Sequence, residues 1–127
     1  MEEKKRKILI VDDEPDVREL LKFRLRDGEG FDIIEAKDGV EACRKAKTEK
    51  PDLIIMDIMM PVMGGYEACK VLKESEETKD IPVIMLTAKT TVGDMEKGVR
   101  AGASEYVMKP YDWNPTLEKI KKYIGDK

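Results

Sequence analysis

Aspartate residues follow two short apolar runs of this sequence, at the point where each run ends. Asp12 and Asp13 come directly after the run at residues 7–11, and Asp57 closes the run that begins at Leu53. Such runs are typical of strands buried on both faces of a parallel sheet. Open α/β sheets place their ligands at the carboxyl ends of these strands. Asp57 alone could simply begin a turn, because Asp is common in turns, so its role depends on what the other strand ends carry.

Two further apolar runs also end in polar side chains. Thr87 closes the run at residues 81–87, and Lys109 follows the run at residues 104–108. Three carboxylates and one lysine at the same edge of a sheet would carry a local charge of about −2 and repel one another. A divalent cation relieves this repulsion, and the absence of His leaves oxygen ligands for any metal. Oxygen ligands favour Mg²⁺, or Mn²⁺.

These side chains together could carry out phosphoryl transfer. Asp57 could attack phosphorus as a nucleophile. Thr87 could donate a hydrogen bond to the transferred group, and Lys109 could neutralise one of its oxygens. Each has a purely structural alternative: Asp12 and Asp13 as helix caps, Thr87 as an ordinary strand-end residue, and Lys109–Pro110 as a turn that could contain a cis bond. Their joint placement at four strand ends favours the phosphoryl chemistry.

Alternating strands and helices are expected to position these residues. Strands are predicted at residues 7–11, 31–36, 53–57, 81–87 and 104–108. Helices are predicted from Pro15 until Gly28 and Gly30, from about Val40 to before Pro51, at about 66–74 and 92–101, and after a cap at Asn114 with Pro115 in the first turn. Gly93 and Gly98 weaken the fourth helix. The expected inward side chains of the other helices are Val17, Leu20, Leu21, Leu25, Val40, Ala42, Cys43, Ala46, Ala68, Val71, Leu72, Leu117, Ile120 and Ile124.

Five strand–helix units in alternation predict a doubly wound parallel sheet with helices on both sides. A flavodoxin-like α/β fold with strand order 2-1-3-4-5 and five helices fits units of this size. No linker, repeat or low-complexity tract interrupts them, so one domain over residues 1–127 is expected.

Composition limits the class of protein. The charged N-terminal segment lacks an apolar signal region and no stretch could span a membrane, so we expect a cytoplasmic protein. The net charge of −3 gives no reason to expect nucleic-acid binding by this chain. The basic run at residues 4–7 is expected to be a solvated terminus. Cys43 and Cys69 are expected to be free thiols in helices, at least partly buried.

The sequence resembles the receiver domain of two-component response regulators, over nearly its whole length. The matching segments are Ile8–Glu14, Asp57–Pro61, Leu86–Ala88, Ala101–Ala103 and Tyr106–Pro110. The resemblance implies a signalling phospho-acceptor rather than a turnover enzyme. The donor would be the phosphohistidine of a sensor histidine kinase or a phosphotransfer protein, and the acceptor would be Asp57.

The resemblance also implies a metal site and a switch. Asp13 and Asp57 would bind Mg²⁺ directly with the backbone carbonyl of Met59, and Asp12 would act mostly through water. Thr87 and Lys109 would hold the phosphoryl oxygens. Thr87 would then move toward the phosphoryl group while Tyr106 rotates inward. The implied output surface for a downstream protein is the fourth helix, fifth strand and last helix, on a monomer or a phosphorylation-linked dimer.

The sequence departs from the family pattern at Gly64, where the family often has a polar residue, and the extra glycine is expected to loosen the loop after Pro61. Met59 and Lys89 occupy positions where the family tunes the lifetime of the phosphoryl group. Three rival interpretations remain. They are an Mg²⁺-dependent phosphohydrolase, which would need a second acid/base carboxylate and a lid; a fragment of a DNA-binding regulator; and a pseudo-receiver that only binds proteins.

Overall fold

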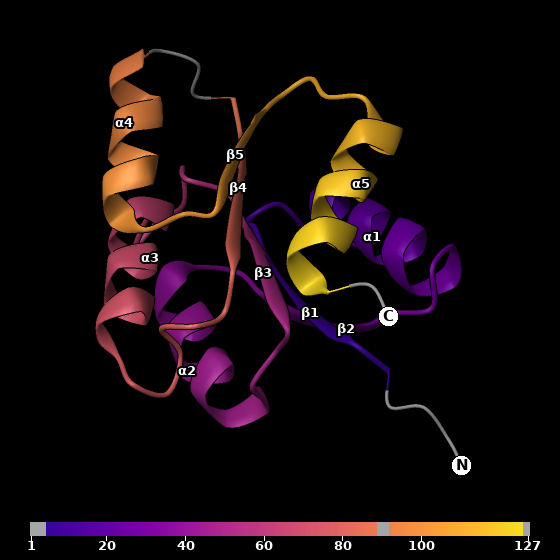
Figure 1. The fold of residues 1–127 in the computed structure, drawn as a ribbon, viewed down its shortest axis with the longest axis horizontal. Coiled ribbons are helices and arrows are strands. Elements are labelled where there is room, and N and C mark those ends of the chain that lie inside the picture. Colours follow the sequence, from indigo (N-terminus) through magenta and orange to yellow (C-terminus); the bar gives the residue numbers. More distant parts are fainter. Residues whose placement is uncertain (1–4, 89–91, 126–127) are drawn as a thin grey trace.

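A five-stranded parallel sheet forms the centre of the structure, a computed structural model that describes residues 5–88 and 92–125. The strand order β2-β1-β3-β4-β5 is the predicted flavodoxin-like order (Figure 1). The strands are β1 (Lys7–Val11), β2 (Asp32–Ala36), β3 (Leu53–Met56), β4 (Val83–Thr87) and β5 (Glu105–Met108). Parallel pairing brings all five carboxyl ends to one edge of the sheet, at the top of Figure 1.

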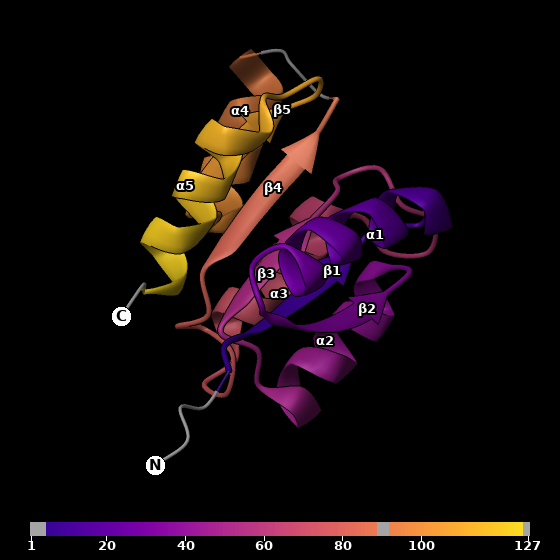
Figure 2. The ribbon, with the colours of Figure 1, turned by 90° about the vertical axis from the view of Figure 1, so that its right-hand side faces the viewer.

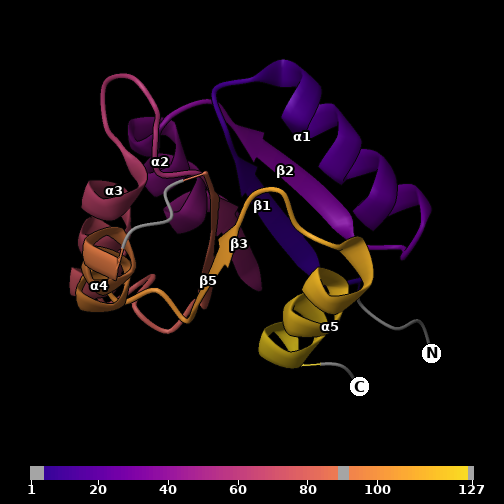
Figure 3. The ribbon, with the colours of Figure 1, turned by 90° about the horizontal axis from the view of Figure 1, so that it is seen from above.

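Helices cover both faces of the sheet. α1 and α5 pack on one face, and α2, α3 and α4 pack on the other (Figures 2 and 3). The helices are α1 (Pro15–Lys22), α2 (Gly39–Glu49), α3 (Gly65–Glu74), α4 (Val92–Ala101) and α5 (Trp113–Ile124). In the part of the chain that the structure describes, no helix is long and apolar enough to cross a bilayer.

The central strands are buried on both faces because their side chains alternate between two apolar cores. Leu9 and Val11 of β1 pack against α2 and α3, whereas Ile8 and Ile10 pack against α1 and α5. Every residue of β3 and β4 is buried. The strands that lead to Asp12 and Asp57, and the strand that ends in Thr87, are therefore packed on both faces.

Some expected inward positions are wrong. Leu20, Val40 and Val71 are 49%, 49% and 37% exposed, because Leu21 and Leu25, Ala42 and Ala46, and Ala68 and Leu72 already occupy the inner stripes of their helices. Leu117 is only half-buried, and Thr116 takes a buried position on α5. The 3.6-residue period locates the apolar stripe of a helix but not its edges.

Helix ends differ from expectation at two places. The first helix continues beyond Lys22 as a π-helical segment over Phe23–Asp27, in which the Gly28 amide donates to the Phe23 carbonyl at 3.2 Å. The last helix begins at Trp113, so the predicted cap at Asn114 is wrong. Pro115 still lies in the first helical turn, where its missing N–H leaves no hydrogen bond unmade.

The expectation for the basic N-terminal run is partly wrong, whereas the expectation for the two cysteines is confirmed. Lys4 of the basic run lies outside the described residues, but Arg6 is not merely solvated, because its Nη1 donates to the Ile124 carbonyl at 2.6 Å. Cys43 is half-buried and Cys69 is buried, both as free thiols, which confirms the expectation.

Candidate functional site

The carboxylates of Asp12, Asp13 and Asp57 meet at the carboxyl edge of the sheet, as the sequence predicts. One ligand oxygen from each lies within 4.8 Å of the others. Backbone hydrogen bonds continue beyond the strands and fix two of these residues: the Asp12 amide donates to the Ala36 carbonyl at 3.1 Å and the Asp57 amide to the Val11 carbonyl at 3.0 Å. The backbone of two cluster members, Asp12 and Asp57, is therefore held by hydrogen bonds to neighbouring strands.

Asp12 is the buried member of this cluster, with 3% of its surface exposed. Burial raises the pKa of Asp12, the hydrogen bond from the Glu14 amide lowers it, and the Asp57 carboxylate raises it further, so that the pKa lies above its usual range. The Glu14 amide donates a hydrogen bond to Oδ1 of Asp12 at 2.9 Å. The Asp12 side chain therefore stabilises the turn before α1, whose N-cap residue is Glu14. An ionised Asp12 is disfavoured here unless a cation compensates for it.

Lys109 joins the cluster from β5. Its amide donates to the Thr87 carbonyl at 2.7 Å, and its peptide bond to Pro110 is cis. Its Nζ lies 3.7 Å from Oδ2 of Asp12 and 3.9 Å from Oδ2 of Asp57. One cation at these distances offsets only part of three negative charges, so the site still fits a divalent cation held by oxygen ligands.

Thr87 is fully buried at the last position of β4, next to the strand that leads to Asp57. Met59, two residues after Asp57, is 59% exposed, and the role of its backbone carbonyl as a metal ligand stays a prediction. Lys89 lies outside the described residues. The structure thus brings Asp12, Asp13 and Asp57 together, with Lys109 beside Asp12 and Asp57, and places Thr87 at the neighbouring strand end.

Backbone hydrogen bonds tie the loop after Asp57 to its surroundings, and the loosening expected from Gly64 stays a prediction. The Gly65 amide donates to the Ile58 carbonyl at 2.9 Å, and the Gly39 amide donates to the Met63 carbonyl at 3.0 Å. A Cβ on Gly65 would lie 2.8 Å from Cα of Ile58 and would also collide with the carbonyl oxygen of Asp57. Glycine at position 65 therefore permits the start of α3 to pack directly against the acceptor strand.

Tyr66 is a residue of this region that the sequence did not single out, because an aromatic residue at a helix start looks like core. Its hydroxyl donates to the Asp94 carbonyl of α4 at 2.7 Å. It also forms a hydrogen bond with Tyr106, and burial followed by this bond raises the pKa of Tyr106. A Cβ on Gly98 would lie 2.8 Å from Cδ2 of Tyr106, so the tyrosine ring packs under α4.

We expect Tyr66→Phe to uncouple Tyr106 from α3. Loss of the hydroxyl removes its hydrogen bonds to Asp94 and Tyr106 and should lower the free energy of unfolding by about 1 to 3 kcal/mol, at the typical contribution of each bond. A double-mutant cycle with Tyr106→Phe, measured by urea unfolding, should give a coupling energy of at least roughly 0.5 kcal/mol. Strictly additive effects of the two substitutions would contradict a link between these hydroxyls.

Curated proteins with similar sequences are regulators about twice as long. The alkaline phosphatase synthesis transcriptional regulatory protein PhoP of Bacillus subtilis is 42% identical over 119 residues, which cover 94% of this chain and 48% of PhoP. The DNA-binding response regulator MtrA of Mycolicibacterium smegmatis is 41% identical over 121 residues, which cover 95% of this chain and 51% of MtrA. The chain thus spans about half the length of the curated relatives it matches.

Solved structures match over nearly their full length. The chemotaxis protein CheY4 of Vibrio cholerae gives a TM-score of 0.87 at 32% identity, covering 94% of this chain and 99% of CheY4. The receiver domain of the sensor histidine kinase PA1611 of Pseudomonas aeruginosa gives a TM-score of 0.87 at 31% identity, covering 96% of this chain and 99% of that domain. That structure has a magnesium ion coordinated in its active-site cleft.

The family assignment rests on most of the chain. Residues 8–121 match the response regulator receiver domain, a signalling phospho-acceptor rather than a turnover enzyme. The fold, the strand order and the acidic cluster agree with this match. The chain therefore belongs to the family of response regulator receiver domains.

Proposed function

We propose that Asp57 accepts a phosphoryl group from the phosphohistidine of a sensor histidine kinase or a phosphotransfer protein. The observation that carries the proposal is the grouping of three carboxylates within 4.8 Å of one another at the strand ends, with the Lys109 Nζ 3.9 Å from the Asp57 carboxylate. Two-component signalling in the cytoplasm is the process in which we place this reaction.

The reaction exchanges one bond to phosphorus for another. A carboxylate oxygen of Asp57 forms a P–O bond while the P–N bond of the donor breaks, and the released imidazole nitrogen takes up a proton. The Asp57 Oδ1 accepts a hydrogen bond from the Ile58 amide at 2.7 Å, which fixes the carboxylate and leaves Oδ2 on the side of Lys109. We assign the attack to Oδ2 for that reason.

Asp13 and Asp57 are the residues that would hold a Mg²⁺ or Mn²⁺ ion directly, with the backbone carbonyl of Met59, and Asp12 would hold it through water. Such an ion neutralises charge on the transferred group and screens the carboxylates from the incoming anion. Asp13 is exposed and Asp57 half-buried, so both can reach an ion that keeps several waters.

Lys109 and Thr87 are proposed to bind the oxygens of the transferred group. Lys109 contributes positive charge from β5, and Thr87 contributes a hydroxyl from β4. An acyl phosphate on Asp57 adds negative charge and new acceptor oxygens. We propose that Thr87 and Tyr106 respond to it and alter the face formed by α4, β5 and α5, where a downstream protein would bind.

The names of PhoP and MtrA favour a second candidate: a receiver that controls DNA binding by a further domain of a longer protein. Both candidates share the chemistry at Asp57. A phosphohydrolase is less well supported, because the matched family consists of signalling phospho-acceptors rather than turnover enzymes.

A small donor with a P–N bond tests the proposal without the unknown kinase. We expect phosphoramidate to give one phosphoryl adduct per chain, seen by intact-protein mass spectrometry. The adduct should require Mg²⁺ and should be lost in hydroxylamine, which cleaves acyl phosphates. An adduct that resists hydroxylamine, or no adduct under conditions that modify CheY4, would contradict the proposal.

Lys109→Ala should leave Mg²⁺ binding intact and slow adduct formation. Its Nζ lies near Oδ2 of both Asp12 and Asp57, so its removal takes positive charge from the transferred group while keeping every carboxylate. The rate should fall roughly tenfold to a hundredfold. Lys119→Ala, which removes a lysine of α5 that pairs with Glu105 of β5, is the matched control and should react at the native rate. A native rate in Lys109→Ala would remove this lysine from the mechanism.

A further inference from the structure

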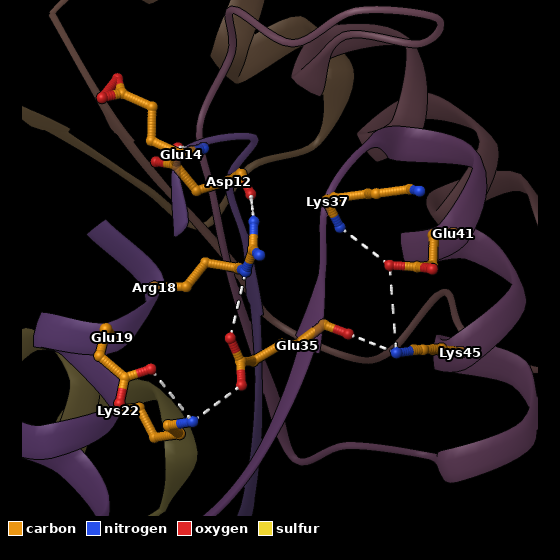
Figure 4. Close-up of polar contacts among 9 residues, drawn as sticks. All are labelled: Asp12, Glu14, Arg18, Glu19, Lys22, Glu35, Lys37, Glu41 and Lys45. Carbon is orange, nitrogen blue, oxygen red and sulfur yellow. Dashed lines mark hydrogen bonds and ion pairs between the residues drawn. The ribbon is translucent and has the colours of Figure 1, made fainter. Parts of the chain in front are cut away.

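A charged network joins α1 to the edge strand β2, outside the acidic cluster (Figure 4). Glu35 of β2 lies at its centre. Arg18 Nε donates to Oε1 of Glu35 at 3.1 Å, and Lys22 Nζ donates to Oε2 at 3.1 Å. Lys45 of α2 donates to the Glu35 carbonyl at 2.6 Å. Three cations from two helices therefore hold one residue of an edge strand.

Arg18 connects this network to the acidic cluster. Its Nη1 donates to the backbone carbonyl of Asp12 at 2.6 Å, while its Nε holds Glu35 (Figure 4). The Asp12 amide bonds the carbonyl of Ala36, the residue after Glu35. Both backbone polar groups of Asp12 are thus tied to the same stretch of β2, one directly and one through Arg18.

The Arg18–Glu35 pair is more than a solvated surface contact. The side chain of Arg18 is 17% exposed and that of Glu35 is 33% exposed. Burial raises the pKa of Glu35, but the hydrogen bonds from Lys22 and Arg18 outweigh burial, so the pKa is lowered. Glu35 is therefore ionised at neutral pH and keeps the planar guanidinium oriented toward Asp12.

The carbonyl of Asp12 begins the turn that orients the carboxylates of Asp12 and Asp13. The peptide plane after Asp12 sets the direction of Asp13, and the Glu14 amide returns to Oδ1 of Asp12 at 2.9 Å. A group that fixes this plane fixes two of the three carboxylates relative to Asp57. Partners that orient metal ligands typically change metal affinity when they are removed.

We propose that Arg18 is a positioning residue for the cation site: it orients Asp12 and Asp13 through the Asp12 carbonyl and thereby sets the affinity for Mg²⁺. The proposal deepens the proposed function and rests on it. Arg18 touches neither the ion nor the phosphoryl group in this account.

The direction of the change in Mg²⁺ affinity distinguishes a positioning role of Arg18 from a purely electrostatic one. Removing a positive charge near three carboxylates should strengthen Mg²⁺ binding if only Coulomb interaction matters. Loss of positioning should weaken it. Arg18→Lys keeps the charge but lacks the fork that holds Glu35 and Asp12 at once, so it should behave like Arg18→Gln.

Calorimetric titration with MgCl₂ tests the proposal on four chains: native, Arg18→Gln, Arg18→Lys and Lys22→Gln. We expect about tenfold weaker binding in both Arg18 variants. Lys22→Gln removes the other cation on Glu35 without touching Asp12 and should bind Mg²⁺ as the native chain does. At saturating Mg²⁺ the Arg18 variants should react with acetyl phosphate at nearly the native rate.

Hydrogen exchange without metal gives an independent readout. The amide of Glu14 should exchange faster in Arg18→Gln than in Lys22→Gln, because its acceptor on Asp12 is less well fixed. Native or stronger Mg²⁺ affinity in the Arg18 variants, or equal exchange in the two variants, would overturn the inference alone. Absence of Mg²⁺ binding by the native chain would instead overturn the proposed function and this inference together.

Discussion

Asp57→Asn is expected to abolish the phosphoryl adduct. An amide oxygen is a far weaker nucleophile than a carboxylate, so adduct formation from acetyl phosphate should fall roughly a thousandfold or more. The Asn oxygen can still accept the hydrogen bond from the Ile58 amide, now made to Oδ1 at 2.7 Å. The fold should therefore persist, and intact-protein mass spectrometry with circular dichroism will report both properties.

The stability of Asp57→Asn should not fall below that of the native chain in metal-free buffer. The Asp57 charge contributes to the raised pKa of Asp12, so its removal relieves repulsion in the cluster. Asp16→Asn, an exposed carboxylate in the first turn of α1, is the matched control and should be modified like the native chain. Stoichiometric labelling of Asp57→Asn would refute the assignment of the acceptor.

Asp13→Ala is expected to remove most of the Mg²⁺ affinity, roughly tenfold to a hundredfold, because a direct carboxylate ligand is lost. Thermal unfolding with and without Mg²⁺ measures this. At an ion concentration ten times its dissociation constant, the native chain should gain about 1.4 kcal/mol of stability, and Asp13→Ala should gain far less.

Without metal, the expected effect of Asp13→Ala on stability has the opposite sign. The Asp13 charge helps to raise the pKa of Asp12, so an ionised Asp12 is less disfavoured once Asp13 is gone. Asp13→Ala should thus be at least as stable as the native chain in a chelating buffer. Glu14→Ala removes an exposed neighbouring carboxylate that makes no capping hydrogen bond, and it should keep the native response to Mg²⁺. An undiminished Mg²⁺ response in Asp13→Ala would exclude this residue as a ligand.

The sequence predicts the sheet and its acidic edge because both depend on short, continuous signals. Apolar runs mark buried strands, and the residue after each run must lie at the carboxyl edge of a parallel sheet. That reasoning places Asp12, Asp57, Thr87 and Lys109 correctly before any contact is known. The flavodoxin-like order 2-1-3-4-5 fits five strand–helix units of this size, and the structure confirms it.

The supporting contacts could not be predicted in the same way. Arg18 is one of several charged residues on a helix, and only the fold brings its guanidinium to the Asp12 carbonyl, six residues earlier in the chain. Tyr66 meets Asp94 across 28 residues through the packing of α3 against α4. Such contacts depend on the crossing of helices and on side-chain rotamers, which leave no periodic signal in the sequence.

Chemical mapping of the modified residue would show whether Asp57 is the phosphoryl acceptor. Borohydride reduces the acyl phosphate of an aspartate to homoserine, and peptide mass spectrometry then locates the changed residue. After treatment with acetyl phosphate and Mg²⁺, we expect homoserine at position 57 and no conversion when Mg²⁺ is omitted. Conversion at Asp12 or Asp13, or a stable phosphoryl adduct on a serine, threonine or lysine, would contradict this assignment.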